Sequence, residues 1–391
     1  MIVAVFNYLY HPVLGRMMSV EEFGEVQVLV SLFLQFGIIG GVFKIMIINV
    51  ISNSDDKEAK ASISALYKVA MNLILAVSLA IIIFSPLLKQ FFQFYSASPF
   101  VVLAIVLFMG IPIIFGESIL QGKHGFTAIS ISQSIASIGK LIFAVIFVFA
   151  GWSSFGAILG ITITQIFSIL YLRTKLKDWG GFDYKDVKVN KRVRKHFRYA
   201  FLVLTVSLTT SLLFSFDILV VKHYFSGEIA GLYGGVAIIA RIVYFITGSI
   251  VGVMLPSIKI KEKGGGNAKV LRKSLVLIAF VGGSTLVFFA IFPEFVIKLM
   301  LGERYLVYAN LLPILSFTLF LVSIINLLFS YMLAIRNYKA ATVSLLGIAI
   351  IIFISLIHHD TPLAVIQNSL ITSLAIIVML SVTRFKNKSS G

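Results

Sequence analysis

The sequence predicts an all-α membrane protein with about twelve transmembrane helices, arranged as two repeated six-helix bundles. Two compositional observations carry this prediction: 59% of the 391 residues are hydrophobic, and only 13% are charged. Soluble domains average about 45–50% apolar and about 25% charged residues. A third observation is an internal repeat, which indicates that one helical unit is written twice.

Apolar segments of about twenty residues match the hydrocarbon thickness of a bilayer. The first segment, 1–15, is too short to span a membrane alone. The repeat indicates either that residues are missing before it, as a misassigned start would explain, or that the first helix is truncated. The predicted segments are 1–15, 26–50, 66–88, 99–121, 126–150, 155–172, 199–221, 230–256, 274–297, 306–333, 340–357 and 362–383.

The repeat is visible at three landmarks in the same order. Ser19-Val20-Glu21-Glu22-Phe23-Gly24 aligns with Ser226-Gly227-Glu228-Ile229-Ala230-Gly231, and the same shift places Pro86 on Pro293. After a gap of about six residues, the sequence LQGK from Leu120 matches LAIR from Leu333. Helix counts between the landmarks agree, so the repeat is parallel. The predicted domains are an N-terminal bundle at 1–177, a basic linker at 178–198 and a C-terminal bundle with a short basic tail at 199–391.

The net charge of +17 first suggests nucleic-acid binding, but the positions of the charges favour a topological signal instead. With an inside N-terminus, 25 of the 33 Lys and Arg residues fall in inside segments, five fall outside and three lie within helices. Positive charge concentrates on the cytoplasmic side of membrane proteins, where it also meets anionic lipids. We therefore expect a multi-pass protein of the cell membrane with both termini in the cytoplasm and no nucleic-acid partner.

Ionisable residues inside apolar helices are costly, so they face a cavity or a partner. Arg241 and Lys140 lie near the middle of their predicted helices, in opposite halves, and two such cations can bind an anionic substrate. Tyr244 lies on the same helix face as Arg241, and Lys44 is placed to reach inward. The alternative is a structural role, in which these cations pair with a carboxylate or with carbonyl groups.

Two carboxylates are candidates for ion coupling. Asp217, about 6 Å from the outer end of its predicted helix at 1.5 Å per residue, can bind a proton or sodium, pair with Arg241, or extend to the interface. Glu117 mirrors it near the inner end of the fourth helix. No phosphate-binding loop is present, so transport would run on a gradient or the membrane potential. We predict no cofactor, and a metal site at His358-His359-Asp360 would need a further ligand.

Two stretches resemble signatures of a known family. The run RMMSVEEFGEVQ from Arg16 and the run FDILVVKHYFSGEIAGLY from Phe216 are similar to the openings of the two halves of Wzx-type polysaccharide flippases. These belong to the multidrug/oligolipidyl/polysaccharide (MOP) exporter superfamily. The resemblance implies two six-helix bundles around a central cavity, alternating access, and an isoprenoid-pyrophosphate-linked oligosaccharide moved from the inner to the outer leaflet. It also implies membrane lipids and other polysaccharide-assembly proteins as partners.

There are three alternatives to a flippase function. Cation-coupled multidrug efflux, found in a related branch, would favour an acidic cavity, whereas the mid-membrane charge here is basic. A membrane enzyme would need clustered carboxylates or a large outer loop, and the predicted outer loops are short, so we expect no enzyme. A nonfunctional flippase fragment is the third alternative.

Overall fold

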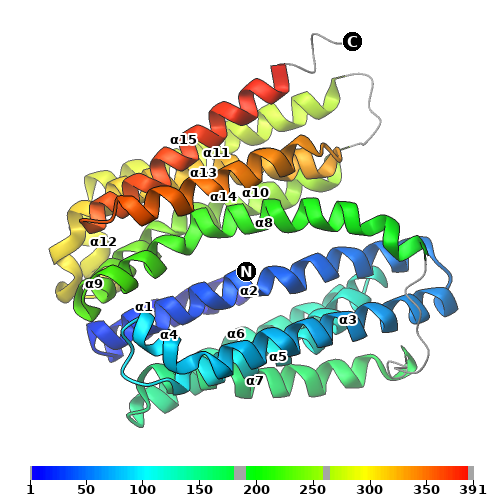
Figure 1. Cartoon of the computed structure of the whole chain (residues 1–391), viewed down its shortest axis with the longest axis horizontal. Helices are drawn as coiled ribbons and strands as arrows, with labels where there is room; N and C mark the ends of the chain where they lie inside the picture. The colour runs from blue at the N-terminus through cyan, green and yellow to red at the C-terminus, as the bar shows by residue number, and fades with distance from the viewer. Residues whose placement is uncertain (1, 180–190, 259–264, 386–391) are drawn as a thin grey trace. The chain divides into compact units, whose positions relative to one another are not determined.

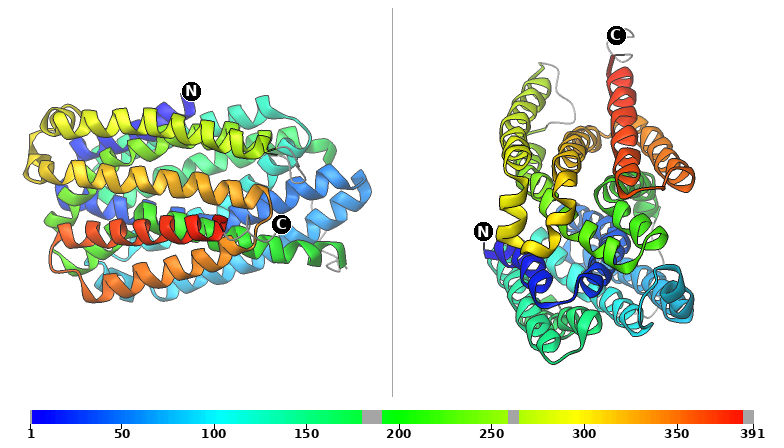
Figure 2. Two further views of the ribbon diagram at one scale, coloured as in Figure 1. Left: turned by 90° about the horizontal axis from the view of Figure 1, so that it is seen from above. Right: turned by 90° about the vertical axis from the view of Figure 1, so that its left-hand side faces the viewer.

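The computed structural model describes residues 2–179, 191–258 and 265–385, and helices are the only regular elements in these ranges. The chain divides into two compact units, residues 1–200 and 201–391. In each unit the long helices run side by side, as Figures 1 and 2 show. The predicted domain boundaries at 177 and 199 remain predictions, because most of the predicted linker lies outside the described residues.

Seven helices and a short 3-10 turn form the first unit, and α8 crosses into the second. They are α1 (Ile2–Met17), α2 (Val20–Asn53), α3 (Asp56–Ile83), α4 (Ser85–Phe91), α5 (Ser98–Gly122), α6 (Phe126–Phe149), α7 (Ser153–Lys175), η1 (Lys177–Trp179) and α8 (Lys191–Tyr224). The second unit continues with α9 (Gly227–Ala240), α10 (Ile242–Met254), η2 (Leu255–Ser257), α11 (Gly266–Ile291), α12 (Pro293–Met300), η3 (Glu303–Leu311), α13 (Leu312–Ala334), α14 (Lys339–Ile357) and α15 (Pro362–Phe385).

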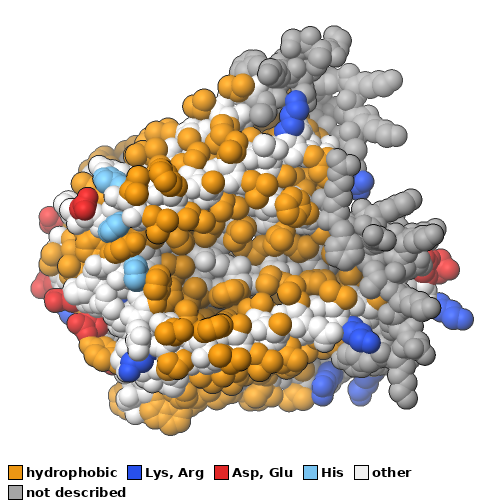
Figure 3. Space-filling model, in the orientation of Figure 1, with side chains coloured by type: hydrophobic (Ala, Val, Ile, Leu, Met, Phe, Trp, Pro, Cys, Tyr) orange, Lys and Arg blue, Asp and Glu red, His pale blue; other side chains and the backbone are white. Residues whose placement is uncertain are grey.

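Eleven helical segments of the described chain are long and apolar enough to cross a membrane. The sequence predicted about twelve, and the difference is α1, which has 16 residues and is shorter than the roughly 20 that the hydrocarbon core requires. Hydrophobic side chains cover the middle of the surface in Figure 3, and the visible Lys and Arg residues gather mainly toward one end. The all-α membrane fold is therefore confirmed.

Two predicted spans are broken at their prolines. The span predicted at 66–88 is divided between α3 and α4, because Pro86 has no N–H to donate to the carbonyl four residues earlier. That carbonyl, of Ile82, instead accepts a 2.8 Å hydrogen bond from the Ser85 hydroxyl. The span predicted at 274–297 is likewise divided between α11 and α12, and Pro293 is the first residue of the second piece.

The landmarks of the repeat occupy equivalent structural positions. Ser19 and Ser226 are the N-cap residues of α2 and α9, and each side chain accepts a hydrogen bond from the backbone N–H three residues later. The third landmark is shifted by one residue. His124 and Arg336 both have left-handed φ angles, 60° and 54°, just after α5 and α13, so Leu120 corresponds to Met332 rather than to Leu333.

Close packing inside the first unit depends on small residues. A Cβ atom on Gly160 of α7 would lie 2.6 Å from the backbone nitrogen of Ala144 in α6. Helices in a bilayer associate through such van der Waals contact, because lipid tails are as apolar as the side chains. A hydrogen bond adds to it, since the Tyr10 hydroxyl of α1 donates to the Ala157 carbonyl of α7 at 3.1 Å.

The second unit has a comparable apolar core. A well-buried cluster joins α10, α11 and α13 through Val251, Met254, Leu271, Ile278 and Leu327. Close approach again requires glycine, because a Cβ on Gly235 of α9 would lie 2.4 Å from the ring of Tyr305. This packing holds α9 and α10, the helices on either side of Arg241.

Candidate functional site

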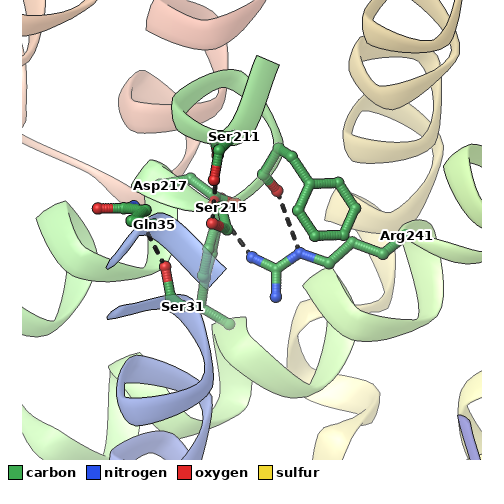
Figure 4. A network of polar contacts seen from close by, with 8 residues as sticks. Ser31, Gln35, Ser211, Ser215, Asp217 and Arg241 are labelled. Carbon is green, nitrogen blue, oxygen red and sulfur yellow. Dashed lines mark hydrogen bonds and ion pairs between the residues drawn. The ribbon is translucent and has the colours of Figure 1, made fainter. Parts of the chain in front are cut away.

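A buried ion pair occupies the point where α9 ends and α10 begins. The Nη2 atom of Arg241 lies 3.2 Å from Oδ1 of Asp217 in α8, and the two residues are only 3% and 8% exposed. Tyr233 of α9 donates its hydroxyl to the other carboxylate oxygen at 2.7 Å. Figure 4 shows the Arg241 side chain reaching toward Asp217. The three residues form the Asp217–Arg241–Tyr233 triad, which joins α8 to α9 and to the junction between α9 and α10.

Arg241 makes further contacts besides its ion pair with the Asp217 carboxylate. Its Nε donates to the backbone carbonyl of Phe214 at 3.2 Å, and its guanidinium carbon lies 5.2 Å from the centre of the Phe214 ring. That ring also packs against Tyr244, with centroids 4.8 Å apart. A guanidinium offers five donors and stacks on aromatic faces, so it satisfies all these contacts together. Tyr244 therefore lies beside the triad, as its shared helix face predicted.

The structure selects one of the alternatives that the sequence left open for Asp217, which is pairing with Arg241. Asp217 also lies deeper than predicted, because α8 continues to Tyr224 and places it seven residues, about 10 Å, from the helix end. Lys222 is also buried, near the end of the same helix. The span predicted at 230–256 lies within one helical segment, Gly227–Ser257, that is long and apolar enough to cross a membrane, and Arg241 is the single residue between α9 and α10 in it. Substrate and ion roles for these residues remain predictions.

Lys140 lies in the other unit. Its Nζ is 4.8 Å from the centre of the Tyr10 ring, so the cation on α6 contacts α1 through an aromatic face. Lys44 on α2 is half-buried. Within the described residues, neither lysine has a carboxylate partner, in contrast to Arg241. Among its described residues, the first unit thus holds two cations within apolar helices that no carboxylate neutralises.

Glu117 near the end of α5 is bound to α6. Ser132 donates to one of its carboxylate oxygens at 2.9 Å, and the Gln133 amide donates to the other at 3.2 Å. The side chain is half-buried. A carboxylate has about four acceptor positions, so Glu117 can accept further hydrogen bonds or bind a cation beside these two donors. The structure places Glu117 and Asp217 in different units.

A second group of carboxylates was not among the residues singled out from the sequence. Glu22 and Glu25, on the first turns of α2, bind the N-terminus of α7 through the hydroxyls of Ser153 and Ser154, respectively. Glu25 also accepts a 2.9 Å hydrogen bond from the backbone N–H of Tyr95. A comparison of the two copies of the repeat could have identified them. The shift that aligns Ser19 with Ser226 places Ile229 and Leu232 at these two positions.

Comparisons with known proteins agree with this architecture. The family model of polysaccharide biosynthesis proteins matches residues 1–260. Among curated proteins no sequence matches the chain. Similar solved structures include an inward-facing multidrug resistance MATE family transporter of the MOP superfamily, with 13% identity and a TM-score of 0.73, covering 100% of this chain and 96% of that one.

Two further structures have the same fold. The lipid II flippase MurJ, in an inward closed conformation, has 17% identity and a TM-score of 0.70, covering 98% of this chain and 86% of that one. A MOP superfamily transporter from Pyrococcus furiosus, described as having a binding pocket of reversed polarity, has 14% identity and a TM-score of 0.63, covering 99% and 93%. At these identities the likeness concerns the fold. The chain is therefore a multi-pass membrane protein with the MOP-superfamily fold, and it belongs to the polysaccharide biosynthesis protein family.

Proposed function

We propose that this protein is a membrane transporter that flips an isoprenoid-pyrophosphate-linked oligosaccharide from the inner to the outer leaflet by alternating access. The observation that carries the proposal is the family match over residues 1–260, combined with the MOP fold of the whole chain. MurJ, which shares this fold, is a lipid II flippase. A protein of polysaccharide biosynthesis with the same fold would move a saccharide carried on a lipid, and it would not be an enzyme.

The charges of the two units support an anionic cargo. Lys44 and Lys140 are half-buried in apolar helices and have no carboxylate partner among the described residues. A pyrophosphate offers several negative oxygens that such cations can bind by charge-assisted hydrogen bonds. Arg241 would join them once its bond to Asp217 opens. In this proposal these cations bind the pyrophosphate while the saccharide crosses and the lipid tail stays in the bilayer.

The triad suggests how an ion gradient would act. Asp217 already holds Arg241, so a proton or sodium ion on this carboxylate would compete with the guanidinium. Loss of the carboxylate charge would release Arg241 toward the pyrophosphate, which couples ion binding to cargo binding. Glu117 would serve as a second coupling carboxylate in the first unit. Membrane lipids and other polysaccharide-assembly proteins remain proposed partners, and both termini are proposed to face the cytoplasm of a cell membrane.

Multidrug efflux is the competing function, because a MATE transporter shares the fold. The charge of the first unit opposes it, since Lys44 and Lys140 would repel a cationic drug. The decisive experiment reconstitutes the protein in vesicles that contain a fluorescent undecaprenyl-pyrophosphate-linked oligosaccharide. Transfer of the saccharide between leaflets, with no uptake of a cationic dye, is the expected result. Dye uptake without saccharide transfer would reject the flippase and favour efflux.

A further inference from the structure

A pocket of about 430 Å³ opens at one end of the first unit. It lies where three parts of the chain meet: the N-terminus of α2, the connection between α4 and α5, and the connection between α6 and α7. The distribution of positive charge predicts that this end of the unit lies on the outer, non-cytoplasmic side of the membrane. Small-molecule sites commonly enclose about 300–1,000 Å³, so the pocket is large enough for a small ligand.

One wall of the pocket is acidic and rich in hydroxyl groups. Glu22 is half-buried, and its carboxylate accepts from the Ser153 hydroxyl and from the Ser19 backbone N–H at 3.1 Å. A carboxylate has about four acceptor positions, so Glu22 can accept further hydrogen bonds. Glu25, 2% exposed, also lines the pocket and accepts a hydrogen bond from the Ser154 hydroxyl. This wall accepts hydrogen bonds from hydroxyl and N–H groups and repels anions.

Aromatic side chains also line the pocket. Trp152 lines the pocket and is 48% exposed, and its ring is stacked on Phe147 with centroids 5.1 Å apart and planes inclined by 5°. Tyr95 and Phe155 line the same space. An aromatic surface packs against the C–H face of a pyranose ring, whose hydroxyl groups meanwhile donate to carboxylates. The indole can pack against the C–H face of a sugar, and the two glutamates and the serine hydroxyls can form hydrogen bonds with its hydroxyl groups.

The repeat indicates that the fold itself does not require this chemistry. Ser226 caps α9 as Ser19 caps α2, yet Ile229 and Leu232 occupy the positions of Glu22 and Glu25. The same helix start therefore forms with apolar residues in the second unit. Glu22 and Glu25 are therefore present in one copy of the repeat only, and there they line a pocket.

We infer that this pocket is an exit subsite for one sugar of the cargo, selective for neutral or amino sugars over uronic acids. The inference deepens the proposed flippase function and rests on it for the identity of the cargo. A neutral pyranose donates hydroxyl hydrogens to Glu22 and stacks on Trp152. An amino or N-acetylamino sugar adds an N–H donor. The carboxylate of a uronic acid would face two glutamates and would be rejected.

The sequence contains only two tryptophans, so fluorescence can report on the pocket directly. Replacing the other one, Trp179→Phe, leaves Trp152 as the single indole in the full chain. The purified variant is titrated with N-acetylglucosamine, glucose and glucuronate, and with mannitol as a control for bulk effects. We expect a saturable change in Trp152 emission with the first two sugars, at millimolar half-saturation, and none with glucuronate or mannitol.

The matched variant is Glu22→Gln, because glutamine preserves the capping box at Ser19 and removes only the charge. We expect its half-saturation concentration to rise about tenfold, the effect of weakening one charge-assisted hydrogen bond. Glu228→Gln, at the equivalent turn of the second unit, should leave the titration unchanged. Equal responses to glucuronate and N-acetylglucosamine, or a non-saturable response, would overturn the inference and leave Trp152 as an interfacial anchor.

The vesicle assay separates this inference from the proposed function. If saccharide transfer occurs while Trp152 shows no saturable response, the exit subsite is rejected and the flippase stands. If Trp152 responds with the expected selectivity but no lipid-linked saccharide is transferred, the flippase is rejected, and with it the assignment of the pocket to the cargo.

Discussion

Arg241 and Asp217 form an ion pair with a 3.2 Å contact between Nη2 and Oδ1, and both side chains are almost fully buried. They lie 24 positions apart in the sequence, on α8 and at the junction of α9 and α10. Taking two charges out of water is costly, so such a pair persists only where its geometry and additional hydrogen bonds are good. Here Tyr233 and the Phe214 carbonyl supply those bonds.

The first prediction concerns the stability of this pair. Asp217→Asn leaves the Arg241 cation buried without its partner charge and should destabilise the protein by about 3–5 kcal/mol. The double variant Asp217→Asn with Arg241→Gln removes both charges and should recover part of the loss. Thermal unfolding in detergent measures both effects. Tyr233→Phe, which removes one hydrogen bond, is the control and should cost about 1 kcal/mol. Additive losses in the double variant would show that the two charges do not interact.

The second prediction concerns the unneutralised cation on α6. Lys140→Gln should lower transfer of the pyrophosphate-linked saccharide about tenfold, because one charge-assisted contact to the cargo is lost. Lys140→Arg keeps the charge and should retain much of the transfer. Lys60→Gln removes an exposed cation of the same unit and serves as the control. Full transfer by Lys140→Gln at normal expression would exclude Lys140 from cargo binding.

Much of the fold could be predicted from the long apolar segments of the sequence and from the residues that mark the ends of helices. Ser19 and Ser226 were recognisable as turn landmarks because a serine N-cap is a local signal, satisfied by hydrogen bonds within four residues. Pro86 and Pro293 were recognised as landmarks, but their effect was misjudged. Each lies in the first turn of a separate short helix, since a proline without an N–H ends the hydrogen-bond ladder of the helix before it.

The site was harder to predict because its contacts join distant positions. The sequence marked Arg241 and Asp217 as costly charges and left their pairing open, since only the fold determines which side chains meet. Glu22 and Glu25 escaped notice because charged residues near a helix start are ordinary. Their hydroxyl partners on α7 are about 130 residues away. The sequence comparison aligned Leu120 with Leu333, whereas the structure aligns it with Met332. This shift by one residue could not be predicted, because the left-handed backbone conformation of Arg336 is not visible in the sequence.

The third prediction uses the two copies of the helix cap. Ser19 participates in a complete capping box, in which Glu22 accepts from the Ser19 backbone N–H at 3.1 Å, whereas Ile229 cannot return such a bond to Ser226. Ser19→Ala should therefore cost about 1–2 kcal/mol and Ser226→Ala about 0.5–1 kcal/mol. Thermal unfolding of the two variants under identical conditions tests this order. A larger loss from Ser226→Ala would contradict the importance of the reciprocal bond.

The last prediction concerns the contact between α6 and α7. Gly160→Ala would place a methyl group 2.6 Å from the backbone nitrogen of Ala144, and a backbone cannot move aside as a flexible side chain can. The helices must separate, so the variant should lose about 1–3 kcal/mol of stability even though alanine favours helix formation over glycine. Gly37→Ala on α2 is the matched control, because nothing lies within 4 Å of its added methyl group. That control should be neutral or stabilised by up to about 1 kcal/mol. Melting temperatures of the two variants in the same detergent decide the matter, and equal stability of Gly160→Ala and Gly37→Ala would mean that the α6–α7 contact is looser than the structure indicates.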